Sequence, residues 1–194
     1  MRPSRPRHGC LMNQSPGQYR RRSLRLPGYN YRSPGAYFIT ICTHGRACLF
    51  GEVAGGDMQL TQYGRIVQDE WSRTTVIRDH VTLDTFTVMP NHVHGIIIIG
   101  GQFADPGVGA HGCAPLCRGP KSLGSIVAGF KSAATKRINE IRSMPGTPVW
   151  QRNYYEHVIR SDADLDRVRR YIVDNPAKWA EDPENPHNVR RLLP

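Results

Sequence analysis

Two histidines separated by one residue are the side chains most suited to chemistry in this sequence. His92 and His94 lie in the run MPNHVHGIIII over residues 89–99. The β-branched residues that follow predict a buried strand, and strand side chains alternate between faces. Both imidazoles would therefore lie on one face, with Val93 on the other. Such a pair could be half of a metal site or half of a site for a charged substrate. The alternative is two polar residues at the start of an ordinary strand.

A tyrosine and an asparagine near the C-terminus form a second candidate pair. Tyr171 and Asn175 are four residues apart in a segment whose apolar residues Leu165, Val168 and Ile172 have helical spacing. Residues four apart stack on one helix face, so a phenol and an amide would project together. A tyrosine that only packs, and an asparagine that only ends the helix before proline, are the alternatives.

Strands and helices alternate along the rest of the sequence. We predict strands over 36–42, 83–89, 92–99 and within 148–160, with 47–50 as a hairpin partner of the first and 51–57 as a loop. We predict helices over 61–78, 122–141 and 161–175, and a long surface loop over 100–120. Pro90 and Asn91 would turn the second strand directly into the histidine strand, which predicts an antiparallel pair. This order favours an α+β fold, with helices packed on a small antiparallel sheet.

Composition bounds the class of protein. The 194 residues are 39% hydrophobic, which suits one domain with a real core. No apolar run is long enough to span a membrane, and the N-terminus lacks the apolar stretch of a secretory signal. The five cysteines have no paired spacing, which favours reduced thiols and a cytoplasmic location. His111, Cys113 and Cys117 could supply three zinc ligands, but no fourth partner is evident.

Positive charge is concentrated at the N-terminus. The formal net charge is +10, and residues 1–33 contain eight arginines and no acidic residue. We interpret 1–33 as a basic, disordered arm that binds nucleic acid, because arginine binds phosphate through two parallel hydrogen bonds. A solvated tail is the alternative. The candidate nucleic-acid-binding residues are Arg20, Arg21, Arg22, Arg25, Lys131, Lys136, Arg137 and Arg152.

Three motifs together resemble a known family. They are MPNHVHGI at 89–96, WQRNYYEHVIR at 150–160 and YIVDNP at 171–176. In this order and spacing they resemble the REP-associated tyrosine transposases, a branch of the single-tyrosine HUH transposases. The resemblance covers about residues 34–180, with 181–194 as a C-terminal tail. It implies a ferredoxin-like α+β fold with a central antiparallel sheet and flanking helices.

The resemblance also implies roles for individual residues. His92 and His94 match the paired metal ligands, Tyr171 matches the nucleophile, and Asn175 matches the position of a third, amide-type ligand. The metal would be Mg²⁺ or Mn²⁺. The substrate would be single-stranded DNA with a hairpin, cleaved through a 5′-phosphotyrosine intermediate during transposition or recombination.

Some alternatives remain open at this stage. Tyr155 is a second candidate nucleophile, and His157 could assist proton transfer or make a structural hydrogen bond. The protein could be a monomer or a homodimer. Its activity could also have been lost, which would leave a DNA-hairpin-binding or general nucleic-acid-binding protein.

Overall fold

The computed structural model describes residues 30–31, 33–100 and 121–189. The basic arm up to residue 29, most of the 100–120 loop and the candidate zinc ligands His111, Cys113 and Cys117 lie outside these residues. No helix within the described ranges combines the length and the apolar character needed to cross a membrane.

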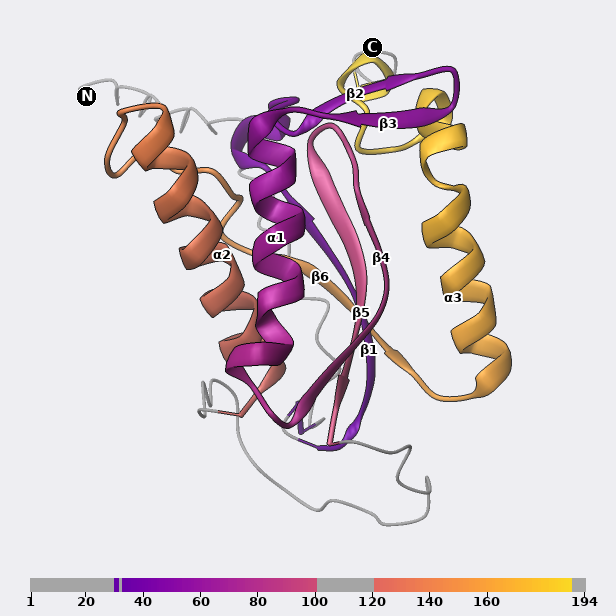
Figure 1. Cartoon of the computed structure of the whole chain (residues 1–194). Coiled ribbons are helices and arrows are strands. Elements are labelled where there is room, and N and C mark those ends of the chain that lie inside the picture. The colour runs from indigo at the N-terminus through magenta and orange to yellow at the C-terminus, as the bar shows by residue number, and fades with distance from the viewer. Residues whose placement is uncertain (1–29, 32, 101–120, 190–194) are drawn as a thin grey trace, which may run out of the picture.

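A four-stranded antiparallel sheet forms the centre of the molecule (Figure 1). Its strands are β1 (Gly35–Cys42), β4 (Val81–Val88), β5 (His92–Ile99) and β6 (Tyr155–Ile159), in the spatial order β4-β5-β1-β6. Helix α1 (Gln62–Ile77) connects β1 to β4, and α2 (Leu123–Ile141) connects β5 to β6. This connectivity and strand order are those of a ferredoxin-like fold, so the predicted fold class is confirmed.

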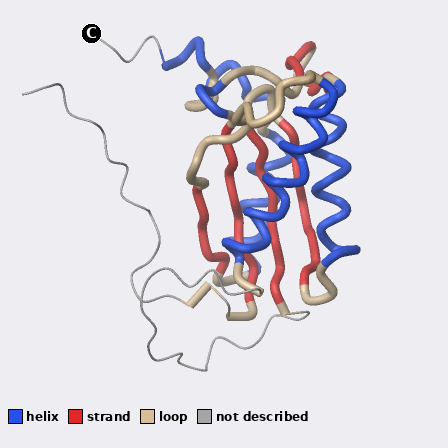
Figure 2. The backbone as a smooth tube through the Cα atoms, turned by 90° about the vertical axis from the view of Figure 1, so that its left-hand side faces the viewer, coloured by secondary structure: helices blue, strands red, loops and turns tan. Residues whose placement is uncertain are grey.

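Helices cover both faces of the sheet. Figure 1 shows α1 and α2 on one side and α3 (Asp162–Asp174) on the other, and Figure 2 shows the same layers from a perpendicular direction. The face toward α1 and α2 contains Tyr37, Ile39, Ile41, Val93 and Ile97. The face toward α3 contains Ala36, Phe38 and Ile96, which pack on Leu165, Val168 and Ile172. His94 and His92 lie two and four residues before Ile96 in the same strand, so their side chains are on the same face as Ile96, the face that α3 covers.

Each of the three long helices begins at a residue that caps it. Thr61 accepts a hydrogen bond from the amide of Gly64, Ser122 from Ser125, and Ser161 from Asp164. Such side chains satisfy amide donors that the first helical turn leaves unpaired. The predicted helices are confirmed to within about two residues.

Two predicted strands differ from the structure. Residues 47–50 are not a strand; instead β2 (Gly51–Ala54) and β3 (Asp57–Leu60) form a separate hairpin that begins within the predicted 51–57 loop. Its turn is Gly55-Gly56, with φ of 63° and 89°, which suits the tight turns that need positive φ at both residues. The last strand is also shorter than predicted, because only Trp150 of the preceding residues makes a bridge, to Thr43.

The chain after α3 returns to the histidine end of the sheet. A 3-10 helix, η2 (Pro176–Glu181), and a short helix, α4 (Pro186–Val189), follow α3. In Figure 1 this yellow segment lies beside the β4–β5 turn and the β2–β3 hairpin. A second short 3-10 helix, η1 (His44–Arg46), follows β1. These short elements close one end of the sheet, where the candidate site lies.

Candidate metal and tyrosine site

His92 and His94 converge at the start of β5. Both are buried, and their Nε2 atoms are 2.9 Å apart. Val93 packs in the opposite core, as strand alternation requires. The predicted shared face of the two imidazoles is confirmed.

Hydrogen bonds to the outer ring nitrogens orient both imidazoles. The Asn91 amide nitrogen donates to the carbonyls of Arg46 and Glu184, at 3.2 and 2.7 Å. The other side-chain atom of Asn91, Oδ1, therefore accepts a hydrogen bond from Nδ1 of His92 at 2.9 Å. This tautomer leaves a lone pair on Nε2 of His92. The Thr40 hydroxyl makes the equivalent contact with Nδ1 of His94, at 2.8 Å. Histidine ligands in metal sites typically have such partners behind them.

Burial keeps both imidazoles neutral. Desolvation lowers the pKa of His92 to about 3, with a smaller contribution from the positive charge of Arg46. Desolvation also lowers the pKa of His94 well below its usual value, with a contribution from His92. Neutral imidazole is the form that binds a metal ion.

The buried carboxylate of Asp182, which our sequence analysis missed, completes a group of candidate metal ligands. Asp182 lies just after η2, and its Oδ2 is 3.9 Å from Nε2 of His92. Ligand atoms of His92, His94 and Asp182 all lie within 4.8 Å of one another. The Glu184 amide donates to Oδ1 of Asp182, which holds the other oxygen toward the histidines. Asp182 lies in the sequence EDPENP at 181–186, where no periodicity or motif distinguishes it from surface acids.

Tyr171 reaches this group from α3. Its hydroxyl is 3.5 Å from Nε2 of His94, and its ring contacts Phe38 edge to face. The side chain is 45% exposed, so one side of it is open to a substrate. Desolvation raises the pKa of Tyr171, and the negative charge of Asp182 raises it further. The hydroxyl is therefore protonated at neutral pH.

Asn175 lies in the same group, one helical turn after Tyr171. Its side chain is 4% exposed and hydrogen-bonds to both Tyr171 and Asp182. Its Oδ1 is buried and has no hydrogen-bond partner. A buried acceptor without a partner is costly, and a cation would satisfy it.

The chemistry of these donors fits a divalent metal ion. Two neutral imidazoles present nitrogen lone pairs, and Asp182 and Asn175 offer oxygen ligands beside them. Burial raises the pKa of Asp182, and the hydrogen bond from the Glu184 amide offsets part of that rise. A bound cation would offset that cost, and mixed nitrogen and oxygen ligands suit Mn²⁺ and, less well, Mg²⁺.

A cleft of about 590 Å³ opens beside the group. Tyr171, His94 and Asp182 line it together with Tyr155, Arg152, Phe38 and Thr40. Tyr155 is as exposed as Tyr171, at 43%, and also contacts Phe38 edge to face, but no described hydrogen bond joins its hydroxyl to either histidine. His157 is not part of the cleft: its Nε2 is 2.8 Å from the carboxylate of Asp164 in the first turn of α3. The structural alternative for His157 is the one that the geometry favours.

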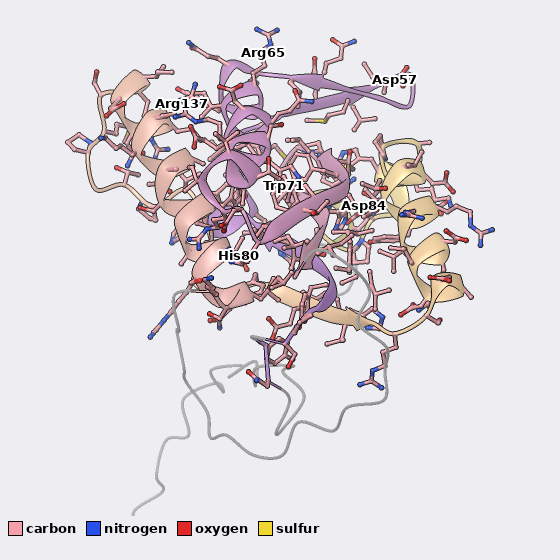
Figure 3. The ribbon with its side chains drawn as sticks, turned by 60° about the horizontal axis from the view of Figure 1, so that its bottom comes forward. Asp57, Arg65, Trp71, His80, Asp84 and Arg137 are labelled. Atoms are coloured by element: carbon pink, nitrogen blue, oxygen red, sulfur yellow. The ribbon has the colours of Figure 1, made fainter. Side chains whose placement is uncertain are left out.

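The four described basic candidates have different surroundings. Arg137 on α2 is paired with Asp69 and Glu70 of α1, and Figure 3 shows it beside that helix. Lys131 donates to the carbonyls of Gln151 and Arg152, and burial lowers its pKa to about 8. Lys136 and Arg152 are exposed and make no ion pair with any described residue. Arg20, Arg21, Arg22 and Arg25 lie outside the described residues.

An ion pair fixes α3 against the edge of the sheet. Arg169 donates from Nε and Nη2 to the two carboxylate oxygens of Asp84, at 3.0 and 2.7 Å. Asp84 lies at a β-bulge in β4, between Leu83 and Phe86, and Figure 3 shows it on the side of α3. Because Arg169 precedes Tyr171 by two residues, the pair also sets the position of the tyrosine along the sheet.

We expect Asp84→Asn to make the protein less stable by about 1 kcal/mol at pH 7, the upper range for a partly exposed pair. Arg169 and the amide and hydroxyl of Thr85 lower the pKa of Asp84 from 3.8 to about 2. A lowered carboxyl pKa contributes stability above the unfolded value and loses it as the pH falls toward the folded value. The difference between wild type and variant should therefore disappear between about pH 4 and pH 2. Urea unfolding across that range measures it, and a difference independent of pH would contradict the assignment.

Comparison with known proteins places the chain in a family. It is 40% identical over 173 residues to an uncharacterised protein of Haemophilus influenzae, across 86% of this chain and 93% of that protein. The chain belongs to the same family as that protein. No protein-family model matches it.

A solved structure identifies the fold. The structure of a REP-associated tyrosine transposase bound to a REP hairpin matches with a TM-score of 0.53 and 19% identity, over 92% of this chain and 88% of that chain. The present chain therefore has the fold of that transposase. This match confirms the fold that the resemblance of the three motifs implied.

Proposed function

We propose that this protein is a metal-dependent, tyrosine-dependent DNA strand transferase that acts on single-stranded DNA beside hairpins. The observation that supports it most directly is the 3.5 Å approach of the Tyr171 hydroxyl to Nε2 of His94, within a group of buried metal-type ligands. The three sequence motifs and the fold of a hairpin-bound transposase support the same function. The reaction would serve DNA transposition or the processing of REP repeats.

Some residues of the site would bind the metal ion, and Tyr171 would attack the phosphate. His92, His94 and Asp182, with Asn175 as a further oxygen ligand, would hold the Mg²⁺ or Mn²⁺ ion. When bound, the ion supplies positive charge beside a scissile phosphate. Tyr171 lies at the open side of the group, where a phosphate in the cleft would meet its hydroxyl.

The tyrosine must lose a proton in order to attack. Its raised pKa makes it a weak nucleophile by itself, so positive charge near the oxygen is required. The phenol oxygen would bond to phosphorus as the bond to the 3′ oxygen of the preceding nucleotide breaks, and that oxygen takes up a proton. The products are a 5′-phosphotyrosine and a free 3′-OH. The phosphodiester energy is retained, so rejoining needs no ATP.

End-labelled DNA tests this chemistry. Purified protein is incubated with Mn²⁺ and a hairpin oligonucleotide labelled at either the 5′ or the 3′ end. We expect an SDS-stable protein complex that carries the 3′ label, while the 5′-labelled fragment is released with a 3′-OH. A complex that carries the 5′ label would reverse the polarity. Tight hairpin binding without any covalent complex would favour the non-catalytic, DNA-binding alternative.

The N-terminal arm is expected to contribute affinity without choosing the site. Its eight arginines should displace counterions, with a slope of log K against log salt of about −0.7 for each phosphate neutralised on single strands. Deletion of residues 1–33 should make that slope shallower and leave the cleavage position unchanged, because phosphate contacts do not read sequence. Fluorescence anisotropy at several salt concentrations measures the slope, and an identical slope after deletion would contradict a role in binding.

A further inference from the structure

A second cleft adjoins the one that contains Tyr171. It has a volume of about 890 Å³ and lies between the C-terminal half of α2 and residues 143–152. Gln151 and Arg152 line both clefts, so the two are neighbours along one surface. Nothing in the chemistry proposed for Tyr171 uses the second cleft, which we call the α2 groove.

The wall of the α2 groove is fastened to the helix at several points. Lys131 donates to the carbonyls of Gln151 and Arg152. Asn139 and Arg142 both donate to the carbonyl of Thr147, at 2.9 and 3.0 Å. These bonds hold the 147–152 segment at a fixed separation from α2. The groove is therefore formed before any ligand arrives, which lowers the cost of ordering on binding.

The lining of the groove combines apolar surface with cations that no acid neutralises. Pro145 and Pro148 are exposed and supply apolar surface, and the buried core residues Val149 and Trp150 also border the groove. Lys136 and Arg152 line the groove, are exposed, and make no ion pair within the described ranges. Glu140 is the only acidic residue of the lining. By contrast, Arg137 on the same helix is fully engaged by two carboxylates.

We propose that the α2 groove binds unpaired nucleotides of the DNA strand that passes through the Tyr171 cleft. Apolar walls suit the faces of bases, and exposed cations suit the phosphates between them. Arg152 lies at the junction of the two clefts, where the strand would cross from one to the other. This inference rests on the proposed function, and it assigns the surface that holds the strand outside the catalytic cleft.

Two variants with matched controls test the groove. Ser132→Trp places a large ring in the groove from an exposed position on α2, and Ser72→Trp makes the same change at an exposed position on α1. Lys136→Glu reverses a charge in the lining. Arg65→Glu reverses a charge at an exposed position on α1 that does not line the groove. Arg152 is left intact because it also lines the catalytic cleft. Thermal unfolding of each variant checks that it is folded.

The measurement is the affinity for hairpins with tails of zero to six unpaired nucleotides at either end. Binding is measured in EDTA, so that no cleavage occurs. We expect an unpaired tail on one side to increase the affinity of wild type by roughly tenfold, the scale of one stacked base. Ser132→Trp and Lys136→Glu should lose most of that increase and bind tail-free hairpins normally, while both controls retain it. Abasic tails should also lose it.

The outcomes separate this inference from the proposed function. Tails that add no affinity, or an equal tail effect in all variants, would overturn the groove assignment even if a covalent complex forms. A loss of the tail effect confined to the groove variants, in a protein that never forms a covalent complex, would support the groove and overturn strand transfer. Weaker binding of tail-free hairpins by Lys136→Glu would assign the groove to the duplex stem instead.

Discussion

Replacing Tyr171 with phenylalanine is expected to abolish strand cleavage and leave folding and hairpin binding almost unchanged. The substitution removes one oxygen and keeps the ring that contacts Phe38. The only described side-chain partners of that oxygen are His94 and Asn175, both within the site. Single-turnover cleavage of a hairpin oligonucleotide with Mn²⁺ should fall below detection, because the nucleophile itself is lost.

Tyr155→Phe is the matched control for this experiment. Tyr155 and Tyr171 line the same cleft, are similarly exposed, and both contact Phe38 edge to face. They differ in that only the Tyr171 hydroxyl approaches a histidine among the described contacts. We expect Tyr155→Phe to retain cleavage within a few-fold of wild type. Loss of cleavage in Tyr155→Phe alone would transfer the nucleophile to β6.

His94→Ala is expected to reduce cleavage by on the order of 10²–10³-fold, the loss seen when one group that stabilises transition-state charge is removed. Its imidazole lies between the other histidine and the Tyr171 hydroxyl, so it connects the metal ligands to the nucleophile. Calorimetric titration with Mn²⁺ should show a matching loss of metal affinity. Cleavage by His94→Ala that remains near the wild-type rate in EDTA would contradict a metal-dependent mechanism.

The third ligand can be assigned with two further variants. Asp182→Asn removes a negative charge close to His92, whereas Asp174→Asn removes one from the exposed end of α3, where Asp174 pairs with Lys178. We expect about a tenfold loss of Mn²⁺ affinity or more in the first variant and none in the second. Loss of affinity in Asn175→Ala, without loss in Asp182→Asn, would restore the single amide ligand that the motif resemblance implies.

The sequence predicted those parts of the site whose geometry is set by the periodicity of a single strand or helix. Alternation along β5 placed the two histidines on one face, and helical spacing along α3 placed Tyr171 and Asn175 one turn apart. These relations hold within a single element, so they follow from backbone geometry alone. That the two elements meet required the antiparallel sheet order, which the motif resemblance supplied.

Asp182 could not be predicted in this way. It belongs to a turn after α3 and reaches His92 through contacts between distant residues, including Asn91 to the carbonyl of Glu184 and Arg46 to the Glu184 carboxylate. The residues next to Asp182 in the sequence give no indication of those contacts. The β2–β3 hairpin was missed for a different reason: its strands are only four residues long, and the signal was confined to the Gly55-Gly56 turn.

Peptide mapping of the covalent complex is the most direct test of the central claim, that Tyr171 attacks DNA held beside His92 and His94. Wild-type protein is reacted with a hairpin oligonucleotide in Mn²⁺, digested with protease and nuclease, and analysed by mass spectrometry. We predict a nucleotide-bearing phosphotyrosine at Tyr171, present in Mn²⁺ and absent in EDTA. A modified Tyr155, or a complex that forms equally well in EDTA, would contradict the claim.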